Sequence, residues 1–556
     1  MKYLSSYFTF VTAIALFFSF EPSSADSHEN FVRCLYNYPD ITNTISNVVY
    51  TQTNSSYSSV LDHTIENRRF SNSSSEPLVI VTPLDVSQIQ ATIICSQRHG
   101  LQIRTRSGGH DYEGLSYVAQ VPFVLLDLLN LRQITVDEES RTAWVQSGAT
   151  LGELYYSISQ KSKTLGFPAG VCASVGIGGH ISGGGYGLIC VNAHIIDVNG
   201  NLLGRQAMGE DLFWAIRGGG GASFGVIVAW KVKLVPVPST VTMFDVSRTL
   251  EENATEIIQK WQLVAHKLDE RIIIRVDITR VNSNKHGKLT IQARFVSLFL
   301  GGVEELIPLM QNSLPELGLD RNDCKETSWI GSAVFNNALL IGSSGNEPPE
   351  SMLNKTQIRF GNYKGKSDYV KKPIPIEGLR GLLRLLCDAK VEYPLVQLAP
   401  YGGIMNEISE SEIAFSHRSQ YIYHIHYGVT WQEEGDEIAQ RHMDWIRRLY
   451  KYMEPYVSNS PRAAYINYRD LDIGVNNNGF TSYTHASIWG LKYFNNNFKR
   501  LAKVKTKVDP KNFFRNEQSI PILSVETIQH KRKQLKMVPQ ITLTNSYALH
   551  ILNCRK

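Results

Sequence analysis

The chain has 556 residues, of which 43% are hydrophobic and 19% are charged, and its formal net charge is +5. This composition is typical of a globular protein, and the length is sufficient for two or three domains. The chain contains no block of like charges and no basic stripe interleaved with aromatic residues. We therefore expect no nucleic-acid partner.

The first 25 residues have the pattern of a secretory signal peptide. Lys2 supplies the positive end, residues 8–20 form an apolar run that is short for a membrane span, and small residues at 23–25 form a cleavage site. The alternative is a buried N-terminal helix. Because no later segment is apolar over a sufficient length to cross a bilayer, we expect a secreted protein with no membrane partner.

Secretion favours disulfides and N-linked glycans. The chain has seven cysteines, an odd number that leaves at least one unpaired. Four Asn-x-Ser/Thr sequons are candidate glycosylation sites, namely Asn54, Asn72, Asn253 and Asn354. Asn54 and Asn72 lie in Ser-rich surroundings, which makes them the stronger candidates.

The pattern from residue 77 onwards predicts an α/β layer. Apolar runs predict strands at 78–81, 101–104, 121–126 and 143–145. Helical spacing over 86–99 predicts a helix that Gly100 closes. Residues 148–230 contain the densest glycine in the chain, and residues 231–238 are typical of a closing strand.

The character of the sequence changes near residue 240, where we place a domain boundary. Glycine becomes rarer beyond this point. Amphipathic helices are expected at 252–269 and 434–453, and alternating strands at 272–279 and 289–295. The last residues, 523–556, have no apolar periodicity, and we interpret them as a loose, atypical tail.

The first of three glycine-rich loops spans residues 104–111 and follows an expected strand. Gly108 and Gly109 allow the backbone to turn its amide groups toward one point, and Arg104 and Arg106 add positive charge. This is how a loop cradles a pyrophosphate. A tight turn at the end of the strand is the alternative.

The second loop spans residues 170–187, and the third spans residues 217–225. The second loop superficially matches the Gly-x-Gly-x-x-Gly fingerprint of dinucleotide-binding folds, but no long helix is expected after it. A glycine-rich structural turn is the alternative. Three such loops in one domain suit a large cofactor with two ends, such as FAD.

The motifs together resemble the plant berberine bridge enzyme-like family of FAD-linked oxidases. They are Arg-Ser-Gly-Gly-His-Asp, Cys-x-x-Val-Gly-x-Gly-Gly-His, Gly-Gly-Gly-Tyr-Gly and Asp-Leu-Phe-Trp-Ala-Ile-Arg-Gly-Gly-Gly, which begin at residues 106, 172, 183 and 211. The resemblance continues at 465–470 and 508–514 and covers roughly residues 30–522. Residues 400–405 and 516–521 are similar to the cannabinoid synthase branch.

This resemblance implies an α+β fold with a PCMH-type (vanillyl-alcohol-oxidase) FAD-binding domain and a separate substrate domain of an antiparallel sheet plus helices. The expected ranges are 26–240 for the FAD-binding domain, 241–460 for the substrate domain and 461–522 for a C-terminal segment that returns to the FAD-binding domain. The resemblance also implies a disulfide between Cys34 and Cys95.

The cofactor implied by the resemblance is FAD with two covalent bonds, one to His110 and one to Cys172. Two electron-withdrawing attachments make a flavin a stronger hydride acceptor. Val175 lies where the family has a residue that controls access of dioxygen, although simple packing explains it equally well. The other expected FAD contacts are Arg104, Arg106, Ser107, Gly108, Gly109, Gly176, Gly178, Gly179, His180, Gly185, Tyr186, Gly187 and Gly225.

The candidate catalytic residues are Tyr468, His426 and His424. The resemblance implies that Tyr468 is the active-site tyrosine, and its reference pKa of about 10 would have to be lowered for it to act as a base. His424 and His426 share one face of an expected strand, where the family has its variable base. The histidine pair lacks a third ligand, so we expect no metal. Tyr112 and Asp277 are expected near the flavin and the substrate.

The resemblance implies an oxidase that passes hydride from an alcohol-type, phenolic or alkaloid small molecule to FAD and reduces dioxygen to hydrogen peroxide. We expect a monomer in the apoplast, with the vacuole as the other destination. Two features depart from the family. The segment 188–207 is shorter than in relatives by roughly ten residues, and Asp277 and His426 replace the histidine and tryptophan of cannabinoid synthases. The alternative is therefore a catalytically impaired secreted glycoprotein that binds FAD poorly.

Overall fold

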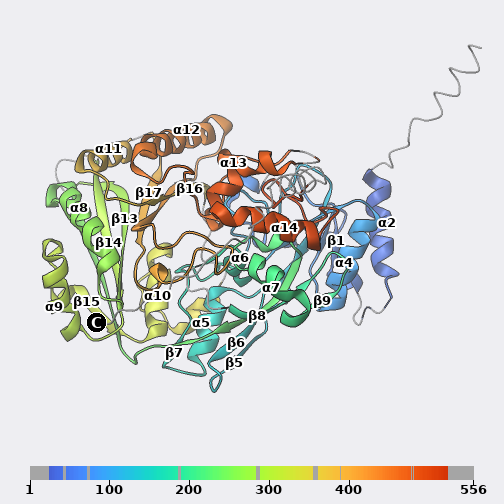
Figure 1. Ribbon diagram of the computed structural model, residues 1–556, viewed down its shortest axis with the longest axis horizontal. Helices are drawn as coiled ribbons and strands as arrows, with labels where there is room; N and C mark the ends of the chain where they lie inside the picture. The colour runs from blue at the N-terminus through green and yellow to red at the C-terminus, as the bar shows by residue number, and fades with distance from the viewer. Residues whose placement is uncertain are drawn as a thin grey trace, which may run out of the picture.

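The computed structural model describes residues 24–39, 41, 45–71, 75–185, 190–283, 289–354, 361–388, 390–477, 479 and 481–523. Figure 1 shows a large sheet with its helices at one end of the molecule and smaller sheets at the other end. Most of the expected signal peptide, the tail from residue 524, Asn72, Tyr186 and Gly187 lie outside the described residues. No helix within these ranges is both long and apolar enough to span a bilayer.

A four-stranded sheet begins the N-terminal half, in the order β1-β2-β4-β3. Its strands are β1 Val49–Thr51, β2 Val79–Val81, β3 Gln102–Arg106 and β4 Phe123–Asp127, and the last three are parallel. Helix α4, Val86–Arg98, connects β2 to β3, and Asp85 caps it by accepting a hydrogen bond from the Gln88 amide at 3.2 Å. The expected strands and helix of this layer are confirmed.

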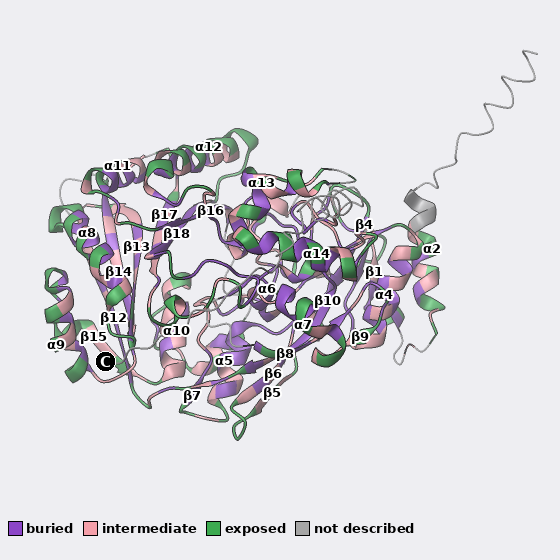
Figure 2. Cartoon of the chain, in the orientation of Figure 1, coloured by how far each residue is buried: buried purple, intermediate pink, exposed green. Residues whose placement is uncertain are grey.

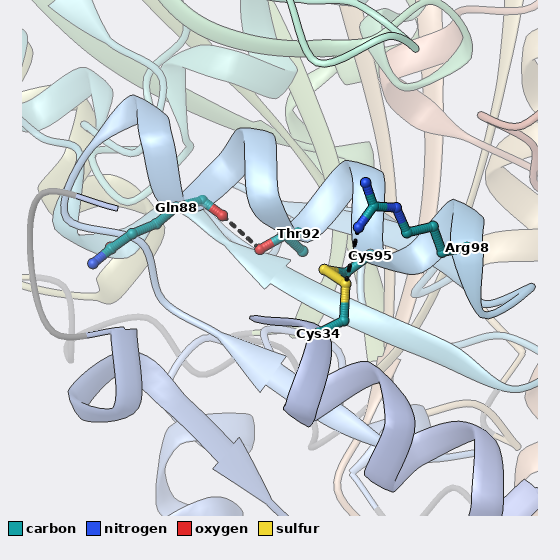
Figure 3. Close-up of a disulfide and its surroundings, with 5 residues drawn as sticks. All are labelled: Cys34, Gln88, Thr92, Cys95 and Arg98. Atoms are coloured by element: carbon teal, nitrogen blue, oxygen red, sulfur yellow. Dashed lines mark hydrogen bonds between the residues drawn. A yellow bond between two sulfur atoms is a disulfide. The ribbon is translucent and has the colours of Figure 1, made fainter. Parts of the chain in front are cut away.

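The Cys34–Cys95 disulfide attaches helix α2, Ser24–Tyr36, to α4, with the two Cα atoms 5.8 Å apart (Figure 3). Thr92 Oγ1 donates a hydrogen bond to the Gln88 carbonyl at 2.7 Å within α4. The structure thus contains the disulfide that the family resemblance implied. It is the kind of bond that an oxidising compartment permits.

A five-stranded antiparallel sheet follows, in the order β5-β6-β10-β8-β9. Its strands are β5 Ile134–Asp137, β6 Thr142–Gln146, β8 Cys190–Ile196, β9 Leu202–Leu203 and β10 Val226–Lys233. Helices α5 Leu151–Ser159, α6 Ile177–Ser182 and α7 Arg205–Ile216 pack with it. The strand expected at 231–238 is divided, because β10 ends at Lys233 and β11, Val235–Pro236, pairs instead with β7, Leu165–Gly166.

The large sheet has seven antiparallel strands in the order β15-β12-β14-β13-β17-β18-β16. They are β12 Val241–Thr249, β13 Ile272–Asn282, β14 Leu289–Phe299, β15 Cys324–Thr327, β16 Asn362–Val370, β17 Tyr393–Pro400 and β18 Tyr423–Trp431. Helices α8 Ala254–Val264, α9 Val303–Ser313, α11 Ile376–Leu386 and α12 Asp436–Met453 enclose a core against one face of the sheet. Figure 2 shows buried strands beneath helices whose outer faces are exposed.

The C-terminal segment returns to the N-terminal half. Helices α13, Tyr483–Phe494, and α14, Phe498–Val508, place Trp489, Phe498 and Leu501 in the same core as α7 and β10. Helix α10, Trp329–Ile341, lies beside α5. The fold is therefore the expected α+β arrangement, with smaller sheets in the N-terminal half and a large antiparallel sheet with helices beyond it, while the predicted domain boundaries stay predictions.

Candidate active site

The first two glycine loops contact each other through their backbones. Gly108 lies just after β3, and a Cβ on it would overlap the backbone of Gly176. The reverse also holds, since a Cβ on Gly176 would overlap Gly108. Gly109 has φ +74° and approaches the Thr64 carbonyl so closely that only glycine fits. Ser107 Oγ adds a hydrogen bond to the Ser147 carbonyl at 2.5 Å.

The two expected attachment residues converge on one hydroxyl group. His110 Nε2 lies 2.9 Å from Ser174 Oγ, and Cys172 Sγ lies 3.5 Å from the same atom. Burial lowers the pKa of His110 to about 4, so its ring is neutral and keeps a lone pair. Burial also raises the pKa of the Cys172 thiol to about 11. The geometry thus brings a neutral imidazole and a protonated thiol to the same place.

The residues around these loops fit FAD. Two buried hydroxyl groups beside the loops, Thr64 Oγ1 and Ser147 Oγ, have no hydrogen-bond partner among the described residues. Buried hydroxyls are normally paired, so these atoms suit a polar ligand. Gly179 adds open space, because a Cβ there would have no atom within 4 Å among the described residues. FAD bound here would supply the hydride-accepting chemistry.

The sequence predicts that Arg104 and Arg106 supply positive charge to a pyrophosphate, but in the structure both side chains bind protein groups. Arg104 Nη2 donates to both carboxylate oxygens of Glu517, at 2.9 and 3.0 Å. Arg106 is fully buried and donates to Asp127 at 2.7 Å and to the Leu61 carbonyl at 2.6 Å. Both guanidinium groups are committed to protein acceptors, so these contacts indicate that they position the loop rather than hold a phosphate.

The other expected FAD contacts lie close to the same loops. Val175 is half-buried against the adjoining core, and Gly178 packs on Ser147. A Cβ on Gly185 would overlap the His180 ring, while one on Gly225 would meet the Ile196 carbonyl. Close packing against β8 therefore requires a glycine at position 225, independently of any contact with FAD.

A cluster of aromatic rings surrounds Tyr468, at the end of the short 3₁₀ helix Ile466–Tyr468. Tyr112 stacks on Tyr468 with ring centroids 5.3 Å apart and planes 5° apart. The His426 ring lies 4.3 Å from Tyr468, and the His424 ring lies 5.3 Å from it. The structure therefore brings the three expected catalytic residues and Tyr112 into one group.

The protonation states of this group follow from burial. Burial raises the pKa of Tyr468 to about 12, although the positive charge of Arg275 opposes the shift. The expected lowering of this pKa is therefore not produced by the protein groups. Burial lowers the pKa of His426 to about 4, against the opposing charge of Asp277. His426 is neutral at physiological pH and has a lone pair for a proton.

Sequence reasoning missed two residues of this site, Tyr363 and Asn67. Tyr363 lies on β16, and its hydroxyl is 2.6 Å from His426 Nε2. Asn67 Nδ2 donates to the carbonyls of Tyr112, at 2.9 Å, and Tyr363, at 3.0 Å. The only signal in the sequence was an aromatic residue in an alternating segment, which is too common to indicate a site.

Asp277 lies on β13, and its charge acts on His426 and Tyr468. Arg275 donates to it at 2.9 Å, and Gln397 Nε2 donates to it at 2.8 Å. Its carboxylate is 17% exposed, so it is accessible from solvent as well as tied to its neighbours. At the surface, the described sequon residues Asn54, Asn253 and Asn354 are all exposed.

Glycine loops that fit FAD, next to a cluster of half-buried tyrosines and buried histidines, define a flavin-dependent oxidoreductase. The family model described as FAD binding domain matches residues 77–199, and the one described as berberine and berberine like matches residues 464–521. Tetrahydroberberine oxidase of Berberis wilsoniae is 49% identical over 516 residues, which cover 90% of this chain and 95% of that protein. Cannabidiolic acid synthase-like 2 of Cannabis sativa is 47% identical over 542 residues, covering 94% and 99%.

A solved structure of the grass pollen allergen Phl p 4, described as a glucose dehydrogenase, is also similar. Its TM-score is 0.82 at 42% identity, with 89% of this chain and 99% of that chain covered. An isoleucine-to-valine variant of Phl p 4, described as a glucose oxidase, has the same TM-score of 0.82. The chain belongs to the berberine bridge enzyme-like family of FAD-linked oxidoreductases.

Proposed function

We propose that this protein is a secreted oxidase that takes hydride from an alcohol group of a small, polyhydroxylated substrate and passes the electrons to dioxygen as hydrogen peroxide. FAD is bound through covalent bonds to His110 and Cys172. The convergence of both side chains on Ser174 Oγ supports this double attachment. The Cys34–Cys95 disulfide and the exposed sequons support secretion.

The observation that carries the choice of substrate is a row of polar residues across the large sheet. Paired positions on successive strands place them side by side, in the order Ser247, Arg294, Asp277, Gln397, His426 and Ser367. The opposite face of these strands carries the apolar core. This row of six polar side chains includes the catalytic candidate His426. It suits a sugar better than a prenylated phenol, which needs a pocket lined by apolar side chains.

The protein's own residues would orient the substrate and accept its proton. Asp277 and Gln397 offer an acceptor and a donor to substrate hydroxyls, and Arg294 adds a donor 33% exposed to solvent. The stacked rings of Tyr112 and Tyr468, which are half-buried, limit the access of water to the reacting group. Hydroxyl deprotonation requires a base, and His426 is the neutral base nearest to Tyr468.

Val175 supports an oxidase over a dehydrogenase. The resemblance places it at the position that controls dioxygen access, and a valine leaves more room than an isoleucine. Phl p 4 is described as a glucose dehydrogenase in its wild-type form and as a glucose oxidase in an isoleucine-to-valine variant. If valine permits and isoleucine blocks access of dioxygen in this chain as well, Val175→Ile should slow the reoxidation of the flavin by dioxygen.

The deciding experiment is the absorption spectrum of protein that has been denatured and washed. A flavin spectrum that stays with the chain in the wild type, in Cys172→Ala and in His110→Ala, and that is lost only in the double variant, is the expected result. A colourless wild-type pellet would refute covalent attachment. Peroxide formation is then measured with D-glucose, cellobiose and coniferyl alcohol.

The second candidate is the impaired glycoprotein, and the short segment 188–207 is the observation that favours it. Cys190 stands at the break and is buried, with its thiol donating to the Asn192 carbonyl at 3.2 Å. This candidate predicts weak flavin binding and no peroxide. Flavin at about one equivalent per chain in the purified protein, with peroxide from any of the three probes, would exclude it.

A further inference from the structure

Tyr363 occupies a position in the site that two glycines make possible. It lies on β16 opposite Thr430 of β18, and its side chain reaches over the adjacent strand. A Cβ on Gly365 would contact the Tyr363 hydroxyl and the Tyr112 ring, and a Cβ on Gly428 would lie 3.4 Å from Tyr363 Cε2. Because these glycines pair with each other across β16 and β18, the sheet leaves room there for a tyrosine ring.

The hydrogen bond between Tyr363 and His426 joins a neutral phenol to a neutral imidazole. Burial raises the pKa of Tyr363 far above its ordinary value, so the phenol keeps its proton. Its hydroxyl lies 2.6 Å from His426 Nε2 and can donate to this nitrogen when the single ring proton of neutral His426 is on Nδ1, which is the tautomer that a relay requires. The Tyr112 ring lies edge-on to the Tyr363 ring, with the ring centroids 4.8 Å apart. The Tyr363 oxygen keeps lone pairs that can accept a hydrogen bond from a substrate hydroxyl.

The backbone of Tyr363 is held from the flavin side of the molecule. Its amide donates to Asn67 Oδ1 at 3.1 Å, and its carbonyl accepts from Asn67 Nδ2 and, at 3.0 Å, from Arg69 Nη1. Asn67 also holds the Tyr112 carbonyl. These bonds fix Tyr363 relative to the ring that stacks on Tyr468, which is the preorganisation that proton transfer needs.

We propose that Tyr363 relays the proton of the substrate hydroxyl to His426. This proposal rests on the proposed function, because it needs an alcohol substrate. The substrate O–H bond breaks as its proton bonds to the Tyr363 oxygen, and the Tyr363 O–H bond breaks as that proton bonds to His426 Nε2. The carbon loses hydride, with its electron pair, to oxidised FAD, and the product is a carbonyl compound. The imidazolium returns its proton to solvent after product leaves.

The groups that face His426 support its role as the final acceptor. They are Tyr112, Tyr363, Tyr468, His424 and Asp277. The three tyrosines and His424 are neutral, since burial moves each of their pKa values away from the charged form. The charge of Asp277 raises the pKa of His426 and thereby favours the imidazolium that the relay forms.

The first test is the rate of anaerobic flavin reduction in Tyr363→Phe, with Tyr423→Phe as the matched control. Tyr423 is a buried tyrosine on the strand that carries His426, but its hydroxyl donates to Gln262 on the other face. We expect Tyr363→Phe to reduce the rate with D-glucose or cellobiose about 100-fold. We expect Tyr423→Phe to stay within about twofold, because it removes one neutral hydrogen bond away from the site.

The solvent isotope effect separates a relay from a structural role. Two protons move in the wild type, so the rate plotted against the deuterium fraction should curve, and the plot should become linear in Tyr363→Phe. An unchanged rate, or a reduced rate with an unchanged plot, would overturn the relay. A reduced rate with a linear plot already in the wild type would assign proton acceptance to Tyr468 instead.

A second measurement does not depend on turnover. In protein labelled with ¹⁵N-histidine, the His426 signals, assigned by their loss in His426→Gln, should show the Nδ1–H tautomer, and Tyr363→Phe should populate the other tautomer. An Nε2–H tautomer in the wild type refutes the relay even if no probe reduces the flavin. Failure of all probes together with the Nδ1–H tautomer would count against the proposed function alone.

Discussion

Replacing Lys364 by methionine tests how the active-site tyrosines are held. Lys364 is 1% exposed, and its ammonium group bridges Glu113 and Asp470, at 2.7 Å from Asp470 Oδ1. Lys366, which is 2% exposed, binds Asp470 and Asp472 at 2.7 and 2.8 Å. Methionine keeps the volume of the side chain but leaves two buried carboxylates short of a cation.

The expected cost follows from that loss of charge. Burial alone would lower the pKa of Lys364, but Asp470 and Glu113 outweigh it and raise the pKa, so the folded state stabilises the ammonium ion. Removing one partner of a buried ion pair costs about 3–5 kcal/mol. We expect a value of roughly 3 kcal/mol, since Lys366 still serves Asp470 and Arg69 lies 3.6 Å from Glu113.

The assay is equilibrium unfolding in urea, followed by tryptophan fluorescence at pH 7. A loss of roughly 3 kcal/mol at a slope of about 3 kcal/mol per molar urea moves the midpoint by roughly 1 M. The matched control is Lys260→Met, which removes an exposed pair with Glu316 at 3.2 Å, and it should cost at most about 1 kcal/mol. Adding Glu113→Gln to Lys364→Met should recover part of the loss, because it neutralises a stranded carboxylate.

Equal midpoints for Lys364→Met and Lys260→Met would refute this reasoning. So would a double variant whose loss is the sum of the two single losses, because the charges would then be independent. The rate of flavin reduction in Lys364→Met is a second, independent measurement, and we expect it to be lower than in the wild type. Glu113 and Lys364 each directly follow an active-site tyrosine in the chain, so a disturbed ion network should also displace Tyr112 and Tyr363.

Two further predictions concern acid stability and the flavin cradle. Burial alone would raise the pKa of Asp472, but Arg447, Lys364 and Lys366 outweigh burial and lower this pKa in the folded state. The ionised carboxylate therefore stabilises the fold at pH values above the unfolded pKa of about 3.9. This stabilisation is lost as the pH falls from that value toward the lower pKa of the folded state. Asp472→Asn should flatten the decline in unfolding midpoint between pH 5 and pH 3, and an unchanged decline would contradict the assignment. Gly176→Ala should lower the flavin content per chain, measured by absorbance, because the new methyl group overlaps Gly108. In Gly179→Ala the new methyl group meets no described atom, so a lower flavin content there would indicate that FAD fills this space. Flavin content equal to the wild type in both variants would show that the second loop, which carries both glycines, does not line the cofactor.

The sequence predicted most of the first layer because its signals are local. The apolar runs before and after α4 and Gly100 at its end lie within a few residues of the structure they specify. The contacts of Gly108 with Gly176 are not local, but the glycine motifs indicated a close backbone approach. The divided strand after Lys233 was missed, since β10 and β11 find different partners that only the tertiary fold supplies.

The candidate site could be predicted only in part. Tyr468, His424 and His426 were predicted as candidates because their motifs resemble a family, and the structure brings the three rings together, while their catalytic roles stay predictions. The roles of Arg104 and Arg106 were not predictable, because Glu517 and Asp127, their acceptors, lie 413 and 21 residues away along the chain. The position of Tyr363 in the site was not predictable for the same reason, because its hydrogen-bond partner, His426, lies 63 residues further along the chain.

The arrangement of charge around the tyrosines explains why they come from three distant segments. Tyr112, Tyr363 and Tyr468 each lie within two residues of a member of the buried ion network, namely Glu113, Lys364 and Asp470. An ammonium ion that binds carboxylates from the other two segments forces these segments to meet at one point, because any other arrangement would leave a charge buried and unpaired. On β16, Tyr363 and Lys364 are consecutive residues, so their side chains project to opposite faces of the sheet. The network therefore positions the tyrosines through the backbone, while the charge of Lys364 stays on the face opposite Tyr363.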